Sequence, residues 1–174
     1  FCNLCGPGFL LSVAGVGIFA SKEAGFLLLG THWAAAVLVG ILFRFQCAPS
    51  KDAAPPPRSL PQDSLGLSQV FPNSVRDSFT ATLGICAFVI FFTVLIQLLQ
   101  SSGLLSRVAL LLAGLLPGIL SPQLCQSFLI GIFELSTGVY SLSEAGATPL
   151  ALPMAAFIMG WGGLSVHCQS LPFL

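Results

Sequence analysis

Charge is what this sequence has least of. Only 7% of its 174 residues are charged and 55% are hydrophobic, whereas about 25% charged residues is ordinary for a globular protein. A soluble domain of this length could not cover its surface with so few charges, so the composition predicts a polytopic helical membrane protein whose first partner is the lipid bilayer. The net charge is zero and no basic tail or patch is present, which argues against nucleic-acid binding.

The sequence also lacks the patterns of a metal site, a disulfide framework or a hydrolase. Its six cysteines are scattered and suit small buried hydrophobic positions. The single C-x-x-C pair, Cys2 and Cys5, has no second ligand pair for zinc, so we expect no metal and no cofactor. Neither Ser136 nor Ser165 lies in a G-x-S-x-G turn. We therefore expect no enzyme, and an intramembrane hydrolase that uses His167 with one of these serines stays a minor alternative.

The apolar runs predict an all-α transmembrane bundle of five or six segments, some of them broken or re-entrant. We expect three parts: a gate-like half-helix and a transmembrane helix over 1–45, a proline-rich linker over 46–73, and further transmembrane helices over 74–174. Ser74 and Asp77 have capping-box spacing and would begin the third part. Because the sequence starts inside a motif and stops abruptly, we expect a piece of a longer polypeptide, truncated at its C-terminal end.

Two glycine-rich places predict breaks in apolar sequence. The first is Gly6–Gly8, where Pro7 could open a half-helix too short to span a bilayer; a normal span cut short by the start of the sequence is the alternative. The second is Gly160–Gly163, which should stop or unwind a helix. Beyond it, three polar residues alternate and would share one side of an extended backbone: Ser165, His167 and Gln169.

Glu134 is the most unusual residue, because its carboxylate lies inside an apolar run, on a helix that we expect Ser121 and Pro122 to start. A charge at the centre of a membrane costs roughly 2.5–3.5 kcal/mol on insertion scales, so it favours a functional role. With Ser136 and Thr137 it could form a substrate or proton site; a carboxylate held by neighbouring hydroxyls for packing alone is the alternative. On one continuous helix, a stripe of small and polar residues would share its face: Ser127, Gly131, Glu134, Gly138 and Ser141.

Five short blocks follow one another along the chain: Phe1–Asn3, Gly6–Phe9, Val16–Phe19, Phe133–Gly138 and Gly160–Gln169. In sequence and order they resemble the YlbJ-type sporulation integral membrane proteins, a family with a nucleoside-recognition or gate domain. The resemblance implies a multi-pass protein that moves dipicolinic acid across the outer forespore membrane of spore-forming bacteria. Family members extend further at both ends and carry another gate motif upstream, so this chain is similar to their C-terminal part.

The resemblance also implies a site for a small anionic solute. Dipicolinate is an aromatic dianion, and half-helix N-termini offer free N–H groups to carboxylates. Glu134 would repel a dianion if ionised, so it suits a proton carrier, a coupling group or a hydrogen-bond anchor. A structural or assembly factor of the forespore membrane that transports nothing is the alternative function, and homo-oligomerisation stays open. The candidate substrate-binding residues are Asn3, Gly6, Gly8, Glu134, Ser136, Thr137, Gly162, Gly163, Ser165, His167 and Gln169.

Overall fold

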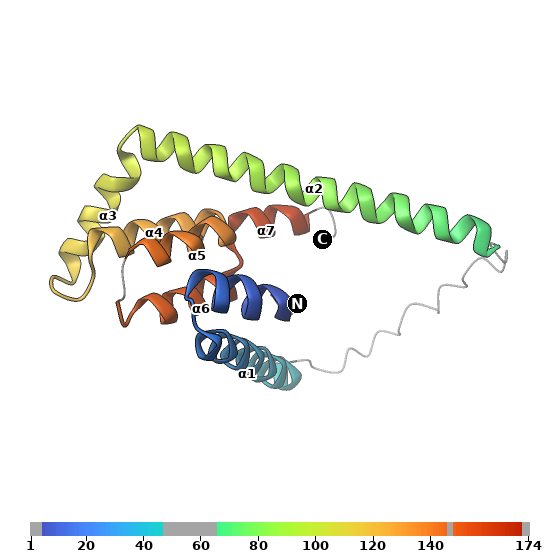
Figure 1. The fold of residues 1–174 in the computed structure, drawn as a ribbon, viewed down its shortest axis with the longest axis horizontal. Coiled ribbons are helices and arrows are strands. Elements are labelled where there is room, and N and C mark those ends of the chain that lie inside the picture. Colours follow the sequence, from blue (N-terminus) through green and yellow to red (C-terminus); the bar gives the residue numbers. More distant parts are fainter. Residues whose placement is uncertain (1–4, 47–65, 146–147, 172–174) are drawn as a thin grey trace.

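A computed structural model describes residues 5–46, 66–145 and 148–171. Within these ranges the chain forms one π-helix and seven α-helices and no strand, which confirms the all-α prediction. Figure 1 shows them in chain order. The elements are η1 (Phe9–Ile18), α1 (Lys22–Gln46), α2 (Leu67–Ser101), α3 (Leu104–Leu115), α4 (Pro122–Phe133), α5 (Leu135–Glu144), α6 (Ala151–Trp161) and α7 (Gly163–Ser170).

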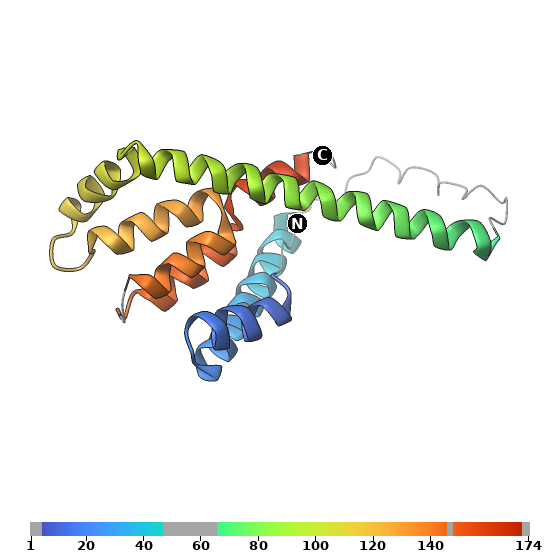
Figure 2. The same ribbon diagram turned by 45° about the horizontal axis from the view of Figure 1, so that its top comes forward.

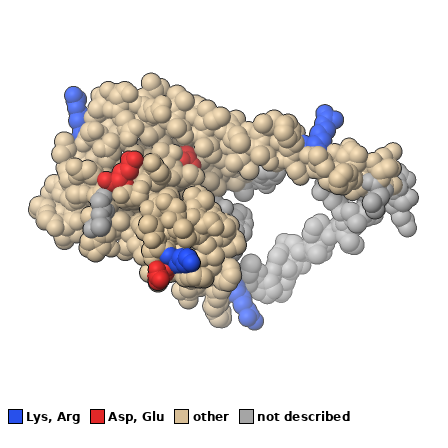
Figure 3. Space-filling model, viewed as in Figure 1, with Lys and Arg blue, Asp and Glu red and all other residues tan. Residues whose placement is uncertain are grey.

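Three stretches are long and apolar enough to cross a membrane: Lys22–Phe45, Ser68–Ser101 and Ala151–Ser170. The last of these contains α6, its break and α7. Their outward side chains are largely apolar; Phe45, for example, is 82% exposed. Figure 3 shows only a few charged side chains on the visible face, most of them widely separated, on a surface that is otherwise uncharged. The length and composition of these helices therefore support a membrane protein.

The N-terminal helix begins as the sequence predicted, with Pro7 in its first turn. η1 and α1 then pack so closely that a Cβ added to Gly15 would lie 2.5 Å from the Cα of Gly25. Small residues that let two backbones approach in this way are common where membrane helices meet. The turn between the two helices is fixed by the N–H of Ser21, which donates to the carbonyl of Gly15 at 2.9 Å.

The predicted start of the second long span was wrong. α2 begins at Leu67 and continues to Ser101 with Pro72 inside it. The end of the expected 46–73 linker is therefore helical, and Ser74 lies in the helix interior instead of capping it. Pro72 lies in the second turn of an exposed helix end, where the loss of one backbone hydrogen bond is tolerated. The rest of that linker, 47–65, lies outside the described residues.

The core lies where α4, α5 and α6 meet η1 and α1. Figures 1 and 2 show α4 and α5 side by side as a hairpin, with α2 crossing above them and α3 connecting α2 to α4. Ser121 caps α4 through its side chain, which accepts the N–H of Leu124, and Pro122 opens the helix as predicted. The buried apolar side chains that join these elements include Leu10, Leu28, Leu124, Val139, Leu142, Ile158 and Met159.

Candidate functional site

The chain reverses direction at Glu134, so the continuous helix expected around this residue was wrong. Glu134 has extended backbone angles (φ −142°, ψ 123°), ends α4 and stands at the N-cap of α5. Its side chain is only 2% exposed. Three hydrogen bonds hold it: Oε1 accepts the N–H of Ser136 at 3.0 Å, and Oε2 accepts both the N–H and the hydroxyl of Thr137 at 2.7 Å. The carboxylate thus replaces the helical bonds that the break removes.

The stripe of small and polar residues meets across this hairpin instead of along one helix. Gly138 lies directly against Gly131, and a Cβ added to Gly138 would overlap the Gly131 backbone. Further along the hairpin, the hydroxyl of Ser127 donates to the carbonyl of Ser141 at 2.9 Å. The spacing of four, three, four and three residues therefore brings the same residues together as expected, but from two antiparallel half-helices.

The second break follows Trp161, as the glycine pattern predicted. Gly162 and Gly163 both have positive φ, 82° and 80°, a conformation that costs a residue with a side chain about 1–2 kcal/mol. The N–H of Gly162 closes α6 on the carbonyl of Ile158 at 2.8 Å. The chain then re-enters a helix at once, because the left-handed glycines change its direction within two residues.

The extended backbone expected after these glycines was wrong. Gly163–Ser170 is helical, so Ser165, His167 and Gln169 do not share one side. Ser165 is buried, Gln169 is half-buried and His167 is exposed. The ring of His167 meets that of Trp161 edge-on, with 4.7 Å between centroids.

The two breaks pack against each other. A Cβ added to Gly163 would lie 3.0 Å from the N of Leu135 and 3.3 Å from the Cα of Glu134. Beside this contact, the indole Nε1–H of Trp161 donates to the carbonyl of Ile132 at 3.2 Å. We call this place, Phe133–Leu135 against Trp161–Gly163, the crossing. Only a glycine at position 163 allows the two backbones to approach so closely.

The half-helices on either side of the crossing are each too short to span a bilayer. α4 has 12 residues and α5 has 10, which at 1.5 Å per residue gives about 18 Å and about 15 Å. Each half-helix therefore covers about half of a hydrocarbon core about 30 Å thick. α6 and α7, with 11 and 8 residues, divide one full crossing between them. Irregular backbone within a bilayer must be buried in protein or line a cavity.

The crossing leaves polar groups free on the α7 side. No side chain caps α7, so its first N–H groups have no partner within the helix. Ser165, in its first turn, is 1% exposed and its Oγ has no hydrogen-bond partner among the described residues. Side chains of a helix lean toward its N-terminus, so this hydroxyl lies on the same side as the free N–H groups.

The N-terminal candidates lie at the start of η1. Asn3 is outside the described residues. Gly6 and Gly8 are exposed, and a Cβ at either would meet open space, so packing does not require a glycine there. Cys5 connects this start to the core: its N–H donates to Nε2 of His32 at 3.0 Å, and its thiol lies 3.9 Å from the Met159 carbonyl. Sequence reasoning did not link these residues, because the contacts join positions far apart in the chain.

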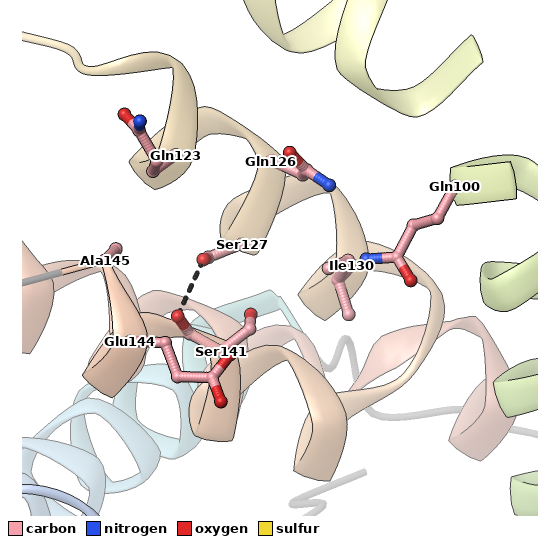
Figure 4. Close-up of a pocket in the computed structure, with 8 residues that line it drawn as sticks. All are labelled: Gln100, Gln123, Gln126, Ser127, Ile130, Ser141, Glu144 and Ala145. Carbon is pink, nitrogen blue, oxygen red and sulfur yellow. Dashed lines mark hydrogen bonds between the residues drawn. The ribbon is translucent and has the colours of Figure 1, made fainter. Parts of the chain in front are cut away.

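A pocket of about 180 Å³ lies at the open end of the hairpin (Figure 4). Sequence reasoning missed it, although the spacing of Gln123, Gln126 and Ser127 on α4 places three polar side chains on one helical face. Among the described residues, no three His, Cys, Asp or Glu side chains are grouped to hold a metal. The pocket is lined by Gln100, Gln123, Gln126, Ser127, Ile130, Ser141, Glu144 and Ala145.

No protein-family model, curated protein or solved structure matches the chain.

Proposed function

We propose that the chain forms the solute-handling part of a multi-pass membrane transporter and that the crossing is its binding site. One observation carries the proposal: two apolar helical stretches break, at Glu134 and at Gly162–Gly163, and Gly163 of one break packs on Glu134 and Leu135 of the other. Discontinuous helices that meet at the midplane are the arrangement by which many transporters expose backbone groups to a solute. A break of this kind would be a poor solution for a helix that serves only as an anchor.

The free groups at the crossing favour a carboxylate solute. The N–H groups at the start of α5 are already occupied by the carboxylate of Glu134. Among the described residues, no side chain caps the start of α7 and the buried hydroxyl of Ser165 has no partner. Free N–H groups and a positive dipole end attract anions. The resemblance to the YlbJ-type proteins extends the proposal to dipicolinate and to the outer forespore membrane.

In this proposal Glu134 is a hydrogen-bond anchor of the broken segment and does not touch the solute. Three donors converge on its two oxygens, which is the arrangement of a carboxylate that holds backbone in place. Because the backbones of Glu134 and Gly163 are in contact, a shift of α7 when the solute binds would still reach Glu134. A proton-carrying or coupling role would require this carboxylate to release the N-terminus of α5 during transport.

A second candidate, a structural or assembly factor that transports nothing, is favoured by the same three bonds. They satisfy the carboxylate of Glu134 entirely within the chain. The intramembrane hydrolase has less support: the Oγ of Ser165 has no hydrogen-bond partner, so His167 does not activate it in this conformation.

Uptake of radiolabelled dipicolinate into proteoliposomes tests the transporter proposal. We expect uptake above that of empty vesicles, and a fall of about tenfold in Ser165→Ala, the size of one lost hydrogen bond to a charged group. Ser170→Ala is the matched control, because Ser170 is exposed on the same helix and bonds only the His167 carbonyl. Uptake no higher than in empty vesicles would favour the scaffold, and an equal effect of the two variants would remove Ser165 from the site.

A further inference from the structure

The polar pocket at the open end of the hairpin is separate from the crossing. It is an open pocket lined by the end of α2, by α4 as far as Ile130 and by the end of α5, and Glu134 is not part of its wall. Figure 4 shows Gln100 reaching from α2 toward Ile130 and Gln126 on α4, with Glu144 on the opposite side from α5. Its polar side chains come from three helices, so it exists only in the folded bundle.

The wall of the pocket is rich in hydrogen-bond acceptors. The hydroxyl of Ser127 donates to the carbonyl of Ser141, and the hydroxyl of Ser141 donates to the carbonyl of Gly138, each at 2.9 Å. Both hydroxyl protons are thus committed within the hairpin, and the serine oxygens can offer only lone pairs to a ligand. When ionised, the carboxylate of Glu144 is an acceptor through both oxygens, and each glutamine adds one carbonyl oxygen beside its NH₂ donor, so the oxygen acceptors outnumber the donor groups.

The charge of the wall is negative. Glu144 is the one ionisable side chain among the eight residues that line the pocket, and none of the eight is basic. An anion would therefore meet repulsion there. A bare metal ion is also a poor fit, because the flexible amides surround about 180 Å³ and do not converge on one point.

We infer that this pocket binds a primary ammonium group, with Glu144 as its counter-ion and the glutamine and serine oxygens as acceptors of its N–H bonds. An ammonium has three donors and no acceptor, which matches an acceptor-rich wall with one negative charge. The group can come from a free amine in solution or from the headgroup of phosphatidylethanolamine in the bilayer. The chemistry is the same in both cases, and the sources are separable by experiment.

The test uses the purified chain in nanodiscs of phosphatidylcholine, titrated with ethanolamine. We expect saturable binding, with choline at least about tenfold weaker, because its quaternary nitrogen has no N–H to donate. Glu144→Gln should weaken ethanolamine binding by a similar factor. Glu23→Gln is the matched control, since Glu23 is exposed at the start of α1 and bonds Ser21 instead.

A second arm identifies the source of the group. In nanodiscs that contain phosphatidylethanolamine, retention of that lipid through purification by the parent chain, but not by Glu144→Gln, would assign the pocket to the headgroup. Ethanolamine binding in phosphatidylcholine discs without such retention would assign it to a solute. The inference is overturned if choline binds as tightly as ethanolamine, if Glu144→Gln binds like the parent chain, or if neither amine source binds.

Discussion

The two breaks that meet at the crossing are built in opposite ways. At Glu134 a charged residue takes an extended conformation, and its own carboxylate occupies the N-terminus of the next helix. At Gly162 and Gly163 the backbone turns through positive φ, and no side chain caps the helix that follows. The groups of the first break bond one another, whereas at the second, within the part of the chain that the structure describes, no side chain caps the helix N-terminus and the hydroxyl of Ser165 has no partner. We infer that the first holds the fold and the second is free to bind.

Closing the hairpin should be the step most easily blocked. In Gly138→Ala the new methyl group would overlap the backbone of Gly131, which cannot move aside as a side chain can. We expect a loss of about 3 kcal/mol or more in the free energy of unfolding, measured by SDS titration in mixed micelles. Gly160→Ala is the control: it meets open space on an exposed face of α6 and should be neutral or slightly stabilising. Equal stability of the two variants would contradict the close contact between Gly131 and Gly138.

Removing the charge of the first break should have the next largest effect. In Glu134→Gln one oxygen becomes an NH₂ group that cannot accept, so at least one of the three donors loses its partner inside the protein. We expect the unfolding free energy to fall by about 1.5–3 kcal/mol. Glu144→Gln, at the exposed end of the same helix, should leave it unchanged. A Glu134→Gln protein as stable as the parent would show that the cap does not hold the break.

Gly163 and Gly118 allow backbone strain to be separated from contact at the crossing. Both have positive φ, 80° and 84°. A Cβ added to Gly163 would lie 3.0 Å from the N of Leu135, whereas a Cβ added to Gly118 would meet open space. Each alanine variant should lose about 1–2 kcal/mol from the left-handed conformation alone. We expect Gly163→Ala to lose more than Gly118→Ala in the same SDS titration. Equal losses of unfolding free energy in the two variants would show that the contact between the two breaks does not restrict position 163.

Thr137 supplies a smaller part of the first break. Thr137→Val keeps the shape of the side chain and the backbone N–H but removes the hydroxyl that donates to Glu134 at 2.7 Å. A decrease of about 1 kcal/mol in the unfolding free energy is expected. Ser136→Ala should cost less, since Ser136 is exposed and donates to Glu134 only through its backbone. A larger loss of stability in Ser136→Ala than in Thr137→Val would contradict the role of the Thr137 hydroxyl in holding Glu134.

Ser165→Ala should have the smallest effect on stability. Its hydroxyl is buried without a partner, so its removal takes away no bond and relieves an unsatisfied group. We expect the midpoint temperature of thermal unfolding in detergent to be unchanged or slightly higher. A marked loss of stability would show that Ser165 serves the fold, and the contrast between the two breaks would then fail.

Sequence patterns predicted the places where helices start and stop through local chemistry. Ser121 with Pro122, and the glycines after Trp161, act on their own backbone, so their effects were foreseeable. The hairpin at Glu134 was not, because a stripe at steps of three and four residues is equally compatible with one long helix. What decides between them is the close fit of Gly131 and Gly138, residues that meet only after the chain has folded back. The linker predicted over 46–73 was too long at its end, because Pro72, a residue that usually interrupts helices, lies inside α2.

The hairpin also has a consequence for membrane topology. Because α4 and α5 run side by side from Ser121 to Glu144 and turn at Glu134, the chain leaves this pair on the side from which it entered. An apolar run of this length, counted as one crossing, would invert the assignment of every later segment. If α4 and α5 together make no net crossing, the next crossing of the bilayer is made by α6 and α7. The return of the chain to the same side therefore depends on the turn at Glu134 and on the close fit of Gly131 and Gly138.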